Sequence, residues 1–286
     1  MTELKYFDSF KNEVLTGLTA LGYEVCEGAS KMAKSNQKPF FVSLPGEGMS
    51  EKIMLCESHF YMLYDKHKNG MSISDILQSL VSYFKDAAML YAGTIASGID
   101  EKNFSRYVYF QLVNTERNKE LLERVPHRSF LDMSVIYRLR PKENVSFIFT
   151  NSLIEKYNTT EEQLFVMAKE NTITNLPPII EAISPDMLAV TNKSAYCGAV
   201  ALLFPEVLKD AAKLLGSDLY IIPASVNDII LMPASEDIDY MRDTIKEAND
   251  TVLYFDEILS YNLYKYDRKT ASIRIFRKGE RNEKFK

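Results

Sequence analysis

Residues 125–150, VPHRSFLDMSVIYRLRPKENVSFIFT, carry the clearest strand signal in the chain. From Phe130 onward apolar and polar side chains alternate, which is typical of a strand with one buried face. The buried face is predicted to carry Leu131, Met133, Val135, Tyr137 and Leu139, and the polar face Asp132, Ser134, Arg138 and Arg140. The turn residues PKEN (141–144) then lead into a second apolar run. The stretch therefore predicts an antiparallel β-hairpin.

Helices and further hairpins are predicted on both sides of this segment. Apolar residues at three- and four-residue steps predict amphipathic helices over 4–21, 59–68, the stretch from Ser72 onward, 160–170 and 205–215. Thr159 and Glu162 form a capping-box pattern for the fourth of these. Two more hairpins are predicted over 219–233 and around 267–270. Because strands and helices follow no regular βαβ order, we expect an α+β fold of mixed helices and mostly antiparallel hairpins in two packed modules.

Prolines suggest where these modules meet. Pro177 and Pro178 stand together, and Pro185 follows soon after. We expect an N-terminal α+β module over 1–183 with a hinge at 92–98, a C-terminal α+β module over 184–277, and a flexible tail over 278–286.

Composition excludes several classes of function. The 286 residues are 46% hydrophobic and 26% charged, which is ordinary for a globular protein. A net charge of −5 gives no positive field for nucleic acid or an anionic membrane, so we expect neither as a partner. The N-terminus lacks the apolar run of a signal peptide, and no stretch approaches ~18 apolar residues. We therefore expect a cytoplasmic protein whose three separate cysteines are reduced thiols.

Common catalytic and cofactor motifs are absent from the sequence. It contains no GxxxxGK[ST], GxGxxG, GxSxG or HExxH pattern. Of the three histidines, His59 and His67 are eight residues apart on one predicted helix, which separates them by about 12 Å. Cys56 and His59 supply only half of a zinc site. We therefore expect neither a metal nor a cofactor.

The best remaining candidate site surrounds the start of the quoted stretch. Its members are Asn114, Arg117, His127, Arg128 and Asp132, which a short helix between two strands could bring together. An enzyme would use His127 and Asp132 as its catalytic pair. The alternative is structural: Asn114 caps the helix over 116–124, His127 binds a backbone carbonyl, and Asp132 pairs with Arg138 or Arg117.

Four blocks of sequence also carry a family resemblance. They are VNTERNKELLERVPHRSFLDMSVIYRL (113–139), EEQLFVMAKENT (161–172), VTNKSAYCGAVALLFPEVLKDAAKLLGSDLYIIPASVNDIILMP (190–233) and DEILSYNLYKYDR (256–268). They resemble DUF5688, a bacterial family of unknown function, which is in turn distantly similar to DUF1444 in an AxxN segment and the closing hairpin. Neither resemblance implies an activity or a cofactor.

The resemblance identifies which residues of this chain correspond to the motifs of the family. The family's PHxxFLD block falls on 126–132, and asparagines at strand ends fall on Asn151 and Asn192. A family hairpin that usually contains a histidine and a glutamate has Asn227 and Asp228 at those places. Because an amide has no useful pKa, this departure argues against a histidine-dependent enzyme.

Three hypotheses follow from these observations. The first is a cytoplasmic binding or regulatory protein without catalysis, for which we consider a mobile-element or phage origin and an unknown protein or small-molecule partner. Its binding residues would be Asn114, Arg117, Arg128, Arg138, Asn192, Asn227 and Asp228. The second is an enzyme of undetermined class, hydrolase by default, centred on His127 and Asp132. The third, ranked last because of the acidic pI of about 5.5, is nucleic-acid binding through Arg117, Arg128, Arg138 and Arg140.

Overall fold

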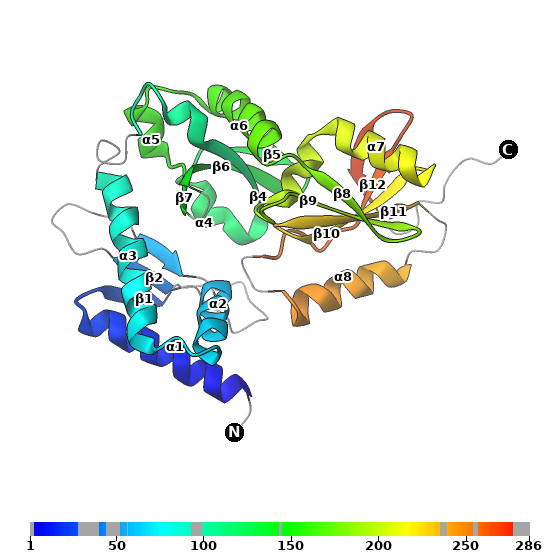
Figure 1. Cartoon of the computed structure of the whole chain (residues 1–286). Helices are drawn as coiled ribbons and strands as arrows, with labels where there is room; N and C mark the ends of the chain where they lie inside the picture. The colour runs from blue at the N-terminus through cyan, green and yellow to red at the C-terminus, as the bar shows by residue number, and fades with distance from the viewer. Residues whose placement is uncertain are drawn as a thin grey trace. The chain divides into compact units, whose positions relative to one another are not determined.

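The computed structural model describes residues 3–27, 40–43, 52–55, 57–92, 99–142, 145–234, 239–253 and 257–276. These separate into two compact units, one formed by the described residues up to Asp100 and the other by those from Glu101 onward (Figure 1). Both units combine helices with antiparallel sheets. The predicted α+β class is therefore confirmed.

In the first unit, helices pack around a core rich in aromatic rings. They are α1 (Glu3–Ala20), α2 (Glu57–Lys68) and α3 (Ile73–Ala92), and the sheet order β1-β2-β3 joins β1 (Glu24–Glu27), β2 (Phe40–Ser43) and β3 (Lys52–Leu55). Four residues of the apolar stripe predicted for the first helix, Phe7, Phe10, Val14 and Leu18, are at most 3% exposed, but the fifth, Leu21, follows the end of α1 and is 54% exposed. Phe7 stacks on Tyr61 with 3.7 Å between ring centroids. The helical periodicity thus gave the correct buried face.

The second unit contains a four-stranded sheet built largely from the quoted stretch. Its order is β4-β6-β5 with β7 also paired to β6, and its strands are β4 (Val108–Asn114), β5 (His127–Phe130), β6 (Met133–Lys142) and β7 (Val145–Ile148). The predicted β6–β7 hairpin is confirmed. Leu131, however, is a turn residue with φ 58° between β5 and β6, and does not share the face of Met133. Both faces of β6 are buried, since Ser134 is 1% exposed.

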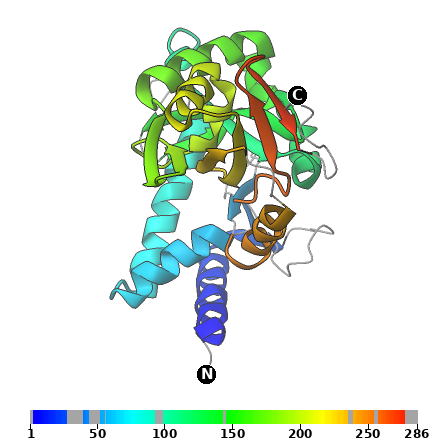
Figure 2. The same ribbon diagram turned by 90° about the vertical axis from the view of Figure 1, so that its right-hand side faces the viewer.

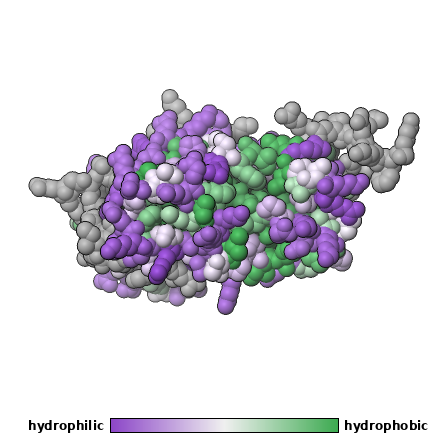
Figure 3. Space-filling view, turned by 90° about the horizontal axis from the view of Figure 1, so that it is seen from above, coloured by the Kyte–Doolittle hydropathy of each residue, from purple (hydrophilic) through white to green (hydrophobic). Residues whose placement is uncertain are grey.

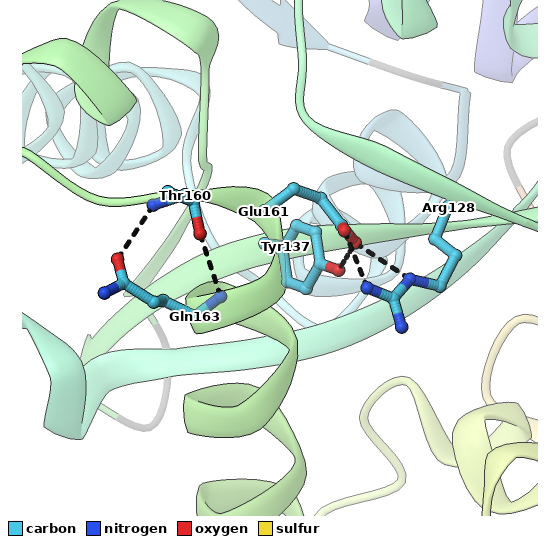
Figure 4. Close-up of polar contacts among 5 residues, drawn as sticks. All are labelled: Arg128, Tyr137, Thr160, Glu161 and Gln163. Carbon is cyan, nitrogen blue, oxygen red and sulfur yellow. Dashed lines mark hydrogen bonds and ion pairs between the residues drawn. The ribbon is translucent and has the colours of Figure 1, made fainter.

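Helices and 3₁₀ turns lie before, between and after the strands of this sheet along the chain. They are the 3₁₀ turns η1 (Phe104–Tyr107) and η2 (Glu116–Asn118), and the α-helices α4 (Lys119–Leu122), α5 (Asn151–Lys156) and α6 (Glu161–Asn175). The capping box of α6 lies one residue later than predicted. Thr160 Oγ1 accepts the N–H of Gln163, and Gln163 Oε1 accepts the N–H of Thr160 (Figure 4). Thr159 is instead buried and donates its hydroxyl to Gln163 Oε1.

A six-stranded antiparallel sheet completes the second unit, in the order β13-β12-β10-β11-β9-β8. Its strands are β8 (Ile179–Ser184), β9 (Met187–Thr191), β10 (Leu219–Ser225), β11 (Asp228–Pro233), β12 (Tyr264–Asp267) and β13 (Ser272–Ile275). The helices η3 (Gly198–Leu203), α7 (Pro205–Leu215) and α8 (Asp239–Thr251) belong to the same unit. α7 and α8 lie on opposite faces of the sheet (Figures 1 and 2). The hairpins predicted over 219–233 and around 267–270 are confirmed.

The division between the units differs from the boundary predicted at residues 183–184. That position lies in the β8–β9 hairpin, where Ser184 pairs with Met187. The paired prolines therefore precede an edge strand and not a linker. The predicted hinge, apart from Ala92, and the predicted tail over 278–286 lie outside the described residues. Within the described part of the chain, no helix is long and apolar enough to cross a membrane.

Candidate functional site

The carboxylate of Asp132 is the centre of the densest polar cluster involving the candidate residues. It follows the tight turn at Leu131, just before β6. Its Oδ2 accepts hydrogen bonds from Ser260 Oγ at 2.6 Å and Asn262 Nδ2 at 3.0 Å, and its Oδ1 accepts one from Tyr264 Oη at 2.5 Å. Burial, and then the negative charge of Asp132, raise the pKa of the Tyr264 hydroxyl above its usual range, so it remains a donor at neutral pH. The carboxylate thus joins the four-stranded sheet to the segment that leads into β12.

Asn114 and Arg117 contact the same C-terminal segment. Asn114 Nδ2 donates to the Leu259 carbonyl oxygen at 3.1 Å, and its Oδ1 accepts the N–H of Arg117 at 2.9 Å. This second bond satisfies a backbone donor of η2, as the structural alternative predicts. Arg117 Nη1 lies 3.4 Å from Tyr261 Oη. Asn114, Arg117 and Asp132 do converge on residues 259–264, and among the three only Asn114 and Arg117 are joined by a side-chain bond in the described structure.

His127 lies elsewhere. It is exposed at the start of β5, where Nδ1 is 3.1 Å from the carbonyl oxygen of Val125. Asp132 follows the opposite end of this strand, and the three steps from His127 to Phe130 alone span roughly 10 Å. General acid–base partners must come within hydrogen-bond reach of one reacting group. The structure therefore does not assemble His127 and Asp132 into one catalytic pair.

Arg128 belongs to a second polar cluster, shown in Figure 4. Its guanidinium binds the Glu161 carboxylate through two bonds, Nε–Oε1 at 3.2 Å and Nη2–Oε2 at 2.7 Å. Tyr137 donates its hydroxyl to Glu161 Oε1. Burial and then this hydrogen bond raise the pKa of Tyr137 well above its ordinary value. The guanidinium also lies 4.1 Å from the centroid of the Phe165 ring. Arg128 therefore anchors α6 to the sheet.

Arg138 and Arg140 belong to a third cluster around Tyr196. Arg138 Nε donates to Ser146 Oγ at 3.0 Å, and its Nη1 donates to Gln111 Oε1 at 2.9 Å. The same Ser146 oxygen accepts the Tyr196 hydroxyl at 2.7 Å, and the Arg140 guanidinium lies 4.7 Å from the centroid of the Tyr196 ring. These arginines join the four-stranded sheet to the loop between β9 and η3 and are not arranged as one exposed basic face.

Asn192, Asn227 and Asp228 hold the loop between β9 and η3 against the β10–β11 turn. Asn192 Nδ2 donates to the Tyr196 carbonyl oxygen at 2.7 Å, and Asn227 Oδ1 accepts the N–H of Cys197 at 3.0 Å. Asp228 Oδ1 accepts the hydroxyl of Ser225. Here Asn227 has the hydrogen-bonding role expected when a histidine is replaced by an amide.

The burial and the thiol pKa of Cys197 decide whether this residue could act as a nucleophile. It is 5% exposed, and burial raises the pKa of its thiol to about 11. Only the thiolate reacts, so we expect Cys197 to resist iodoacetamide in native protein at pH 8 and to be alkylated fully in denaturant. Peptide mass spectrometry measures both states, with half-buried Cys26 as the internal comparison. Rapid native alkylation of Cys197 would contradict the buried, protonated thiol.

Metal binding finds no support in the described residues, where no three His, Cys, Asp or Glu side chains are grouped closely enough to hold an ion. Cys56, which is half of the pattern considered for zinc, lies outside that part of the chain.

The tyrosines of the closing hairpin, Tyr264 and Tyr266, are at most 1% exposed and belong to the core.

Sequence reasoning missed the partners of the candidate residues. Ser260 and Asn262 complete the Asp132 cluster, and neither was singled out. Glu161 was interpreted as a solvated surface carboxylate, but it binds Arg128 and Tyr137. The alternation of polar and apolar residues in 258–264 could have signalled a strand-like segment, but nothing in it identifies Asp132 as its partner.

The whole chain was compared with protein families, curated proteins and solved structures. The model of a family described only as "Family of unknown function (DUF5688)" matches residues 6–185 and 181–268. The chain belongs to the DUF5688 family. No curated protein and no solved structure matches it. The more distant likeness to DUF1444 stays a prediction. In this DUF5688 chain, the matched region contains all three polar clusters. The family description names no activity, so function must be argued from the chemistry of those clusters.

Proposed function

We propose that this DUF5688 protein is a cytoplasmic binding or regulatory protein that works by contact and not by catalysis. One observation carries the proposal: the side chains best suited to chemistry are engaged in internal hydrogen bonds. The Asp132 carboxylate accepts three hydrogen bonds, and the Glu161 carboxylate binds both Arg128 and Tyr137. Such saturated carboxylates stabilise a fold and are poorly placed to accept a substrate proton.

The hydrolase alternative requires an arrangement of residues that differs from the one around His127 and Cys197. A hydrolytic site needs a nucleophile, a base and a group that stabilises developing charge, all within hydrogen-bond reach. His127 is exposed at the end of an edge strand, away from Asp132. The thiol of Cys197 is buried and protonated at neutral pH. No observation on these residues favours the hydrolase alternative over binding.

Two exposed apolar side chains on one side of α6 support a contact function. Val166 is 55% exposed and Ile173 is 46% exposed. They are seven residues apart and so lie on one side of the helix. Green side chains gather across the middle of the face drawn in Figure 3, between hydrophilic regions. Exposed apolar side chains that gather in this way are typical of sites that bind a protein or an apolar ligand. With a net charge of −5, nucleic acid is not an expected partner.

The test combines capture with a defined affinity measurement. Immobilised protein should retain a specific protein or small molecule, which mass spectrometry identifies and calorimetry then measures with the purified pair. We expect Val166→Glu and Ile173→Glu to weaken that binding at least about tenfold, because each places a charge in a desolvated contact. Thr174→Glu, an exposed position on the same helix, is the matched control.

A screen for turnover addresses the alternative directly. Hydrolase and phosphatase substrates should give background rates. Turnover that disappears in His127→Ala while the circular dichroism spectrum is unchanged would contradict the proposed function. His127 is exposed, so this substitution should leave the fold intact.

A further inference from the structure

The two outer strands of the six-stranded sheet form complementary edges. Among the described residues, β8 pairs only with β9, and β13 pairs only with β12. In Figure 2 the red β12–β13 hairpin lies at one side of this sheet and the yellow-green strands at the other. An outer strand presents backbone N–H and C=O groups that can pair with another strand. Each edge is therefore a template for sheet extension.

The strand directions decide how two copies could join. Every neighbouring pair in this sheet is antiparallel, and the sheet has six strands. Directions alternate across it, so β8 and β13 run in opposite directions. A second copy added edge to edge in the same orientation would therefore place its β13 antiparallel to β8, and the alternation would continue without a break.

The side chains on these edges also match in charge. Paired residues lie on the same face of a sheet, and the face alternates along each strand. A series of residues on one face of the sheet connects Glu181 to Arg274. Each is either the cross-strand partner of the one before or two positions along the same strand, and the series is Ala189, Ile230, Ile222, Tyr220 and Lys265. Glu181 and Arg274 are both exposed and thus occupy the same face at opposite edges.

We propose that the chain associates with a second copy of itself by pairing β8 of one copy with β13 of the next. The antiparallel register places Glu181 opposite Arg274 of the second copy. The same register places Ile180 opposite Ile275, Ala182 opposite Ile273, and Ile179 opposite Phe276. These three apolar pairs lie on both faces, Ile183 lies opposite Ser272, and the only acidic residue of β8 meets the only arginine of β13.

The local charges favour this register over others. Lys265 and Arg274 are directly opposite each other, so the face at the β13 edge carries two cationic side chains. Asp267 shares that face, where its carboxylate accepts the N–H groups of Lys269 and Thr270 in the turn and interacts electrostatically with Lys265. An exposed ion pair adds little affinity but penalises wrong partners. Backbone hydrogen bonds and the apolar pairs therefore supply the affinity, and Glu181 with Arg274 selects the register.

The symmetric alternative is disfavoured by the same charges. Two β8 strands paired around a two-fold axis would bring Glu181 close to Glu181 of the other copy, and like charges across a ladder destabilise it. Head-to-tail pairing is heterologous, so the assembly grows beyond a dimer into a ring or a filament. This inference concerns self-association and is independent of the binding surface on α6.

Charge reversal tests the pairing. Sedimentation velocity should show oligomers of the full chain that grow with concentration beyond a dimer. Glu181→Arg and Arg274→Glu should each weaken association roughly tenfold, since each replaces attraction by repulsion, and the double reversal should restore it. Glu170→Arg, an exposed change on α6, should have no effect. A monomer at every concentration would overturn the proposal. So would loss in Glu181→Arg alone with a normal Arg274→Glu, because Arg274 would then not be the partner of Glu181.

A cysteine cross-link checks the register itself. Chains carrying Ala182→Cys, mixed under mild oxidation with chains carrying Ile273→Cys, should form a disulfide between different chains, because opposed residues bring their Cβ atoms close enough. Each variant oxidised alone is the control for the native cysteines. Cross-linking of Ala182→Cys with itself, without the mixed product, would overturn the proposed register.

Discussion

Asp132→Asn should lower the free energy of unfolding of the second unit by roughly 3 kcal/mol. The carboxylate accepts bonds from Ser260, Asn262 and Tyr264, all on one short segment. An amide keeps the shape but offers only one acceptor oxygen, so a donor that bonded the other carboxylate oxygen loses its acceptor. At least one buried donor is then left unsatisfied.

The measurement is chemical denaturation followed by tyrosine fluorescence, with Asp210→Asn as the matched control. Asp210 is exposed on α7, so its change should stay within about 0.5 kcal/mol. Tyr264→Phe removes one donor and leaves the carboxylate with two, so it should cost less than Asp132→Asn. An unchanged unfolding midpoint for Asp132→Asn would show that the cluster does not hold the C-terminal segment.

Gly198→Ala should destabilise the second unit by about 3 kcal/mol, because the added methyl group has no space. A Cβ at this position would lie 2.7 Å from Thr191 Oγ1 and 2.9 Å from Thr191 Cα, and closer still to the Asn227 carbonyl oxygen. Two of these three atoms are backbone, so relief requires β9 or the β10–β11 turn to move. That movement would also disturb the bond from Thr191 Oγ1 to the Asn227 carbonyl oxygen.

Gly17→Ala is the matched control for Gly198→Ala. A Cβ at Gly17 would lie 2.5 Å from Leu77 Cδ1, which is the end of a flexible side chain and can rotate away. Alanine also favours the interior of α1 over glycine by about 1 kcal/mol. We therefore expect a small change for Gly17→Ala and a large one for Gly198→Ala in thermal melts. Equal effects would argue against the backbone contact as the cause.

Local sequence patterns predicted most of the individual elements. The apolar stripes of α1 and α3 gave their buried faces, and the proline and glycine around α7 marked its ends. Turn residues between apolar runs predicted the β6–β7, β10–β11 and β12–β13 hairpins. These patterns succeed because periodicity and turn chemistry act over a few residues, within one element or one tight connection.

Some local predictions failed for identifiable reasons. β8 was missed because the prolines before it suggested a boundary, although proline is compatible with an edge strand. β5 was missed because its two-residue turn places Leu131 at positive φ, where glycine is the usual residue. The cap of α6 was placed one residue early because Thr159 and Thr160 both fit the pattern.

The sequence by itself determined the class of fold, the paired hairpins and the candidate residues Asp132, Arg128 and Arg138 at the polar clusters, since these follow from local periodicity and side-chain chemistry. Only the tertiary structure decided which residues meet. Asp132 was expected to pair with Arg138 or Arg117, yet its donors come from 260–264, more than 125 positions later. Arg128 likewise meets Glu161 across two elements. Hydrogen-bond partners over such separations depend on strand order and on how sheets pack, which no local period encodes.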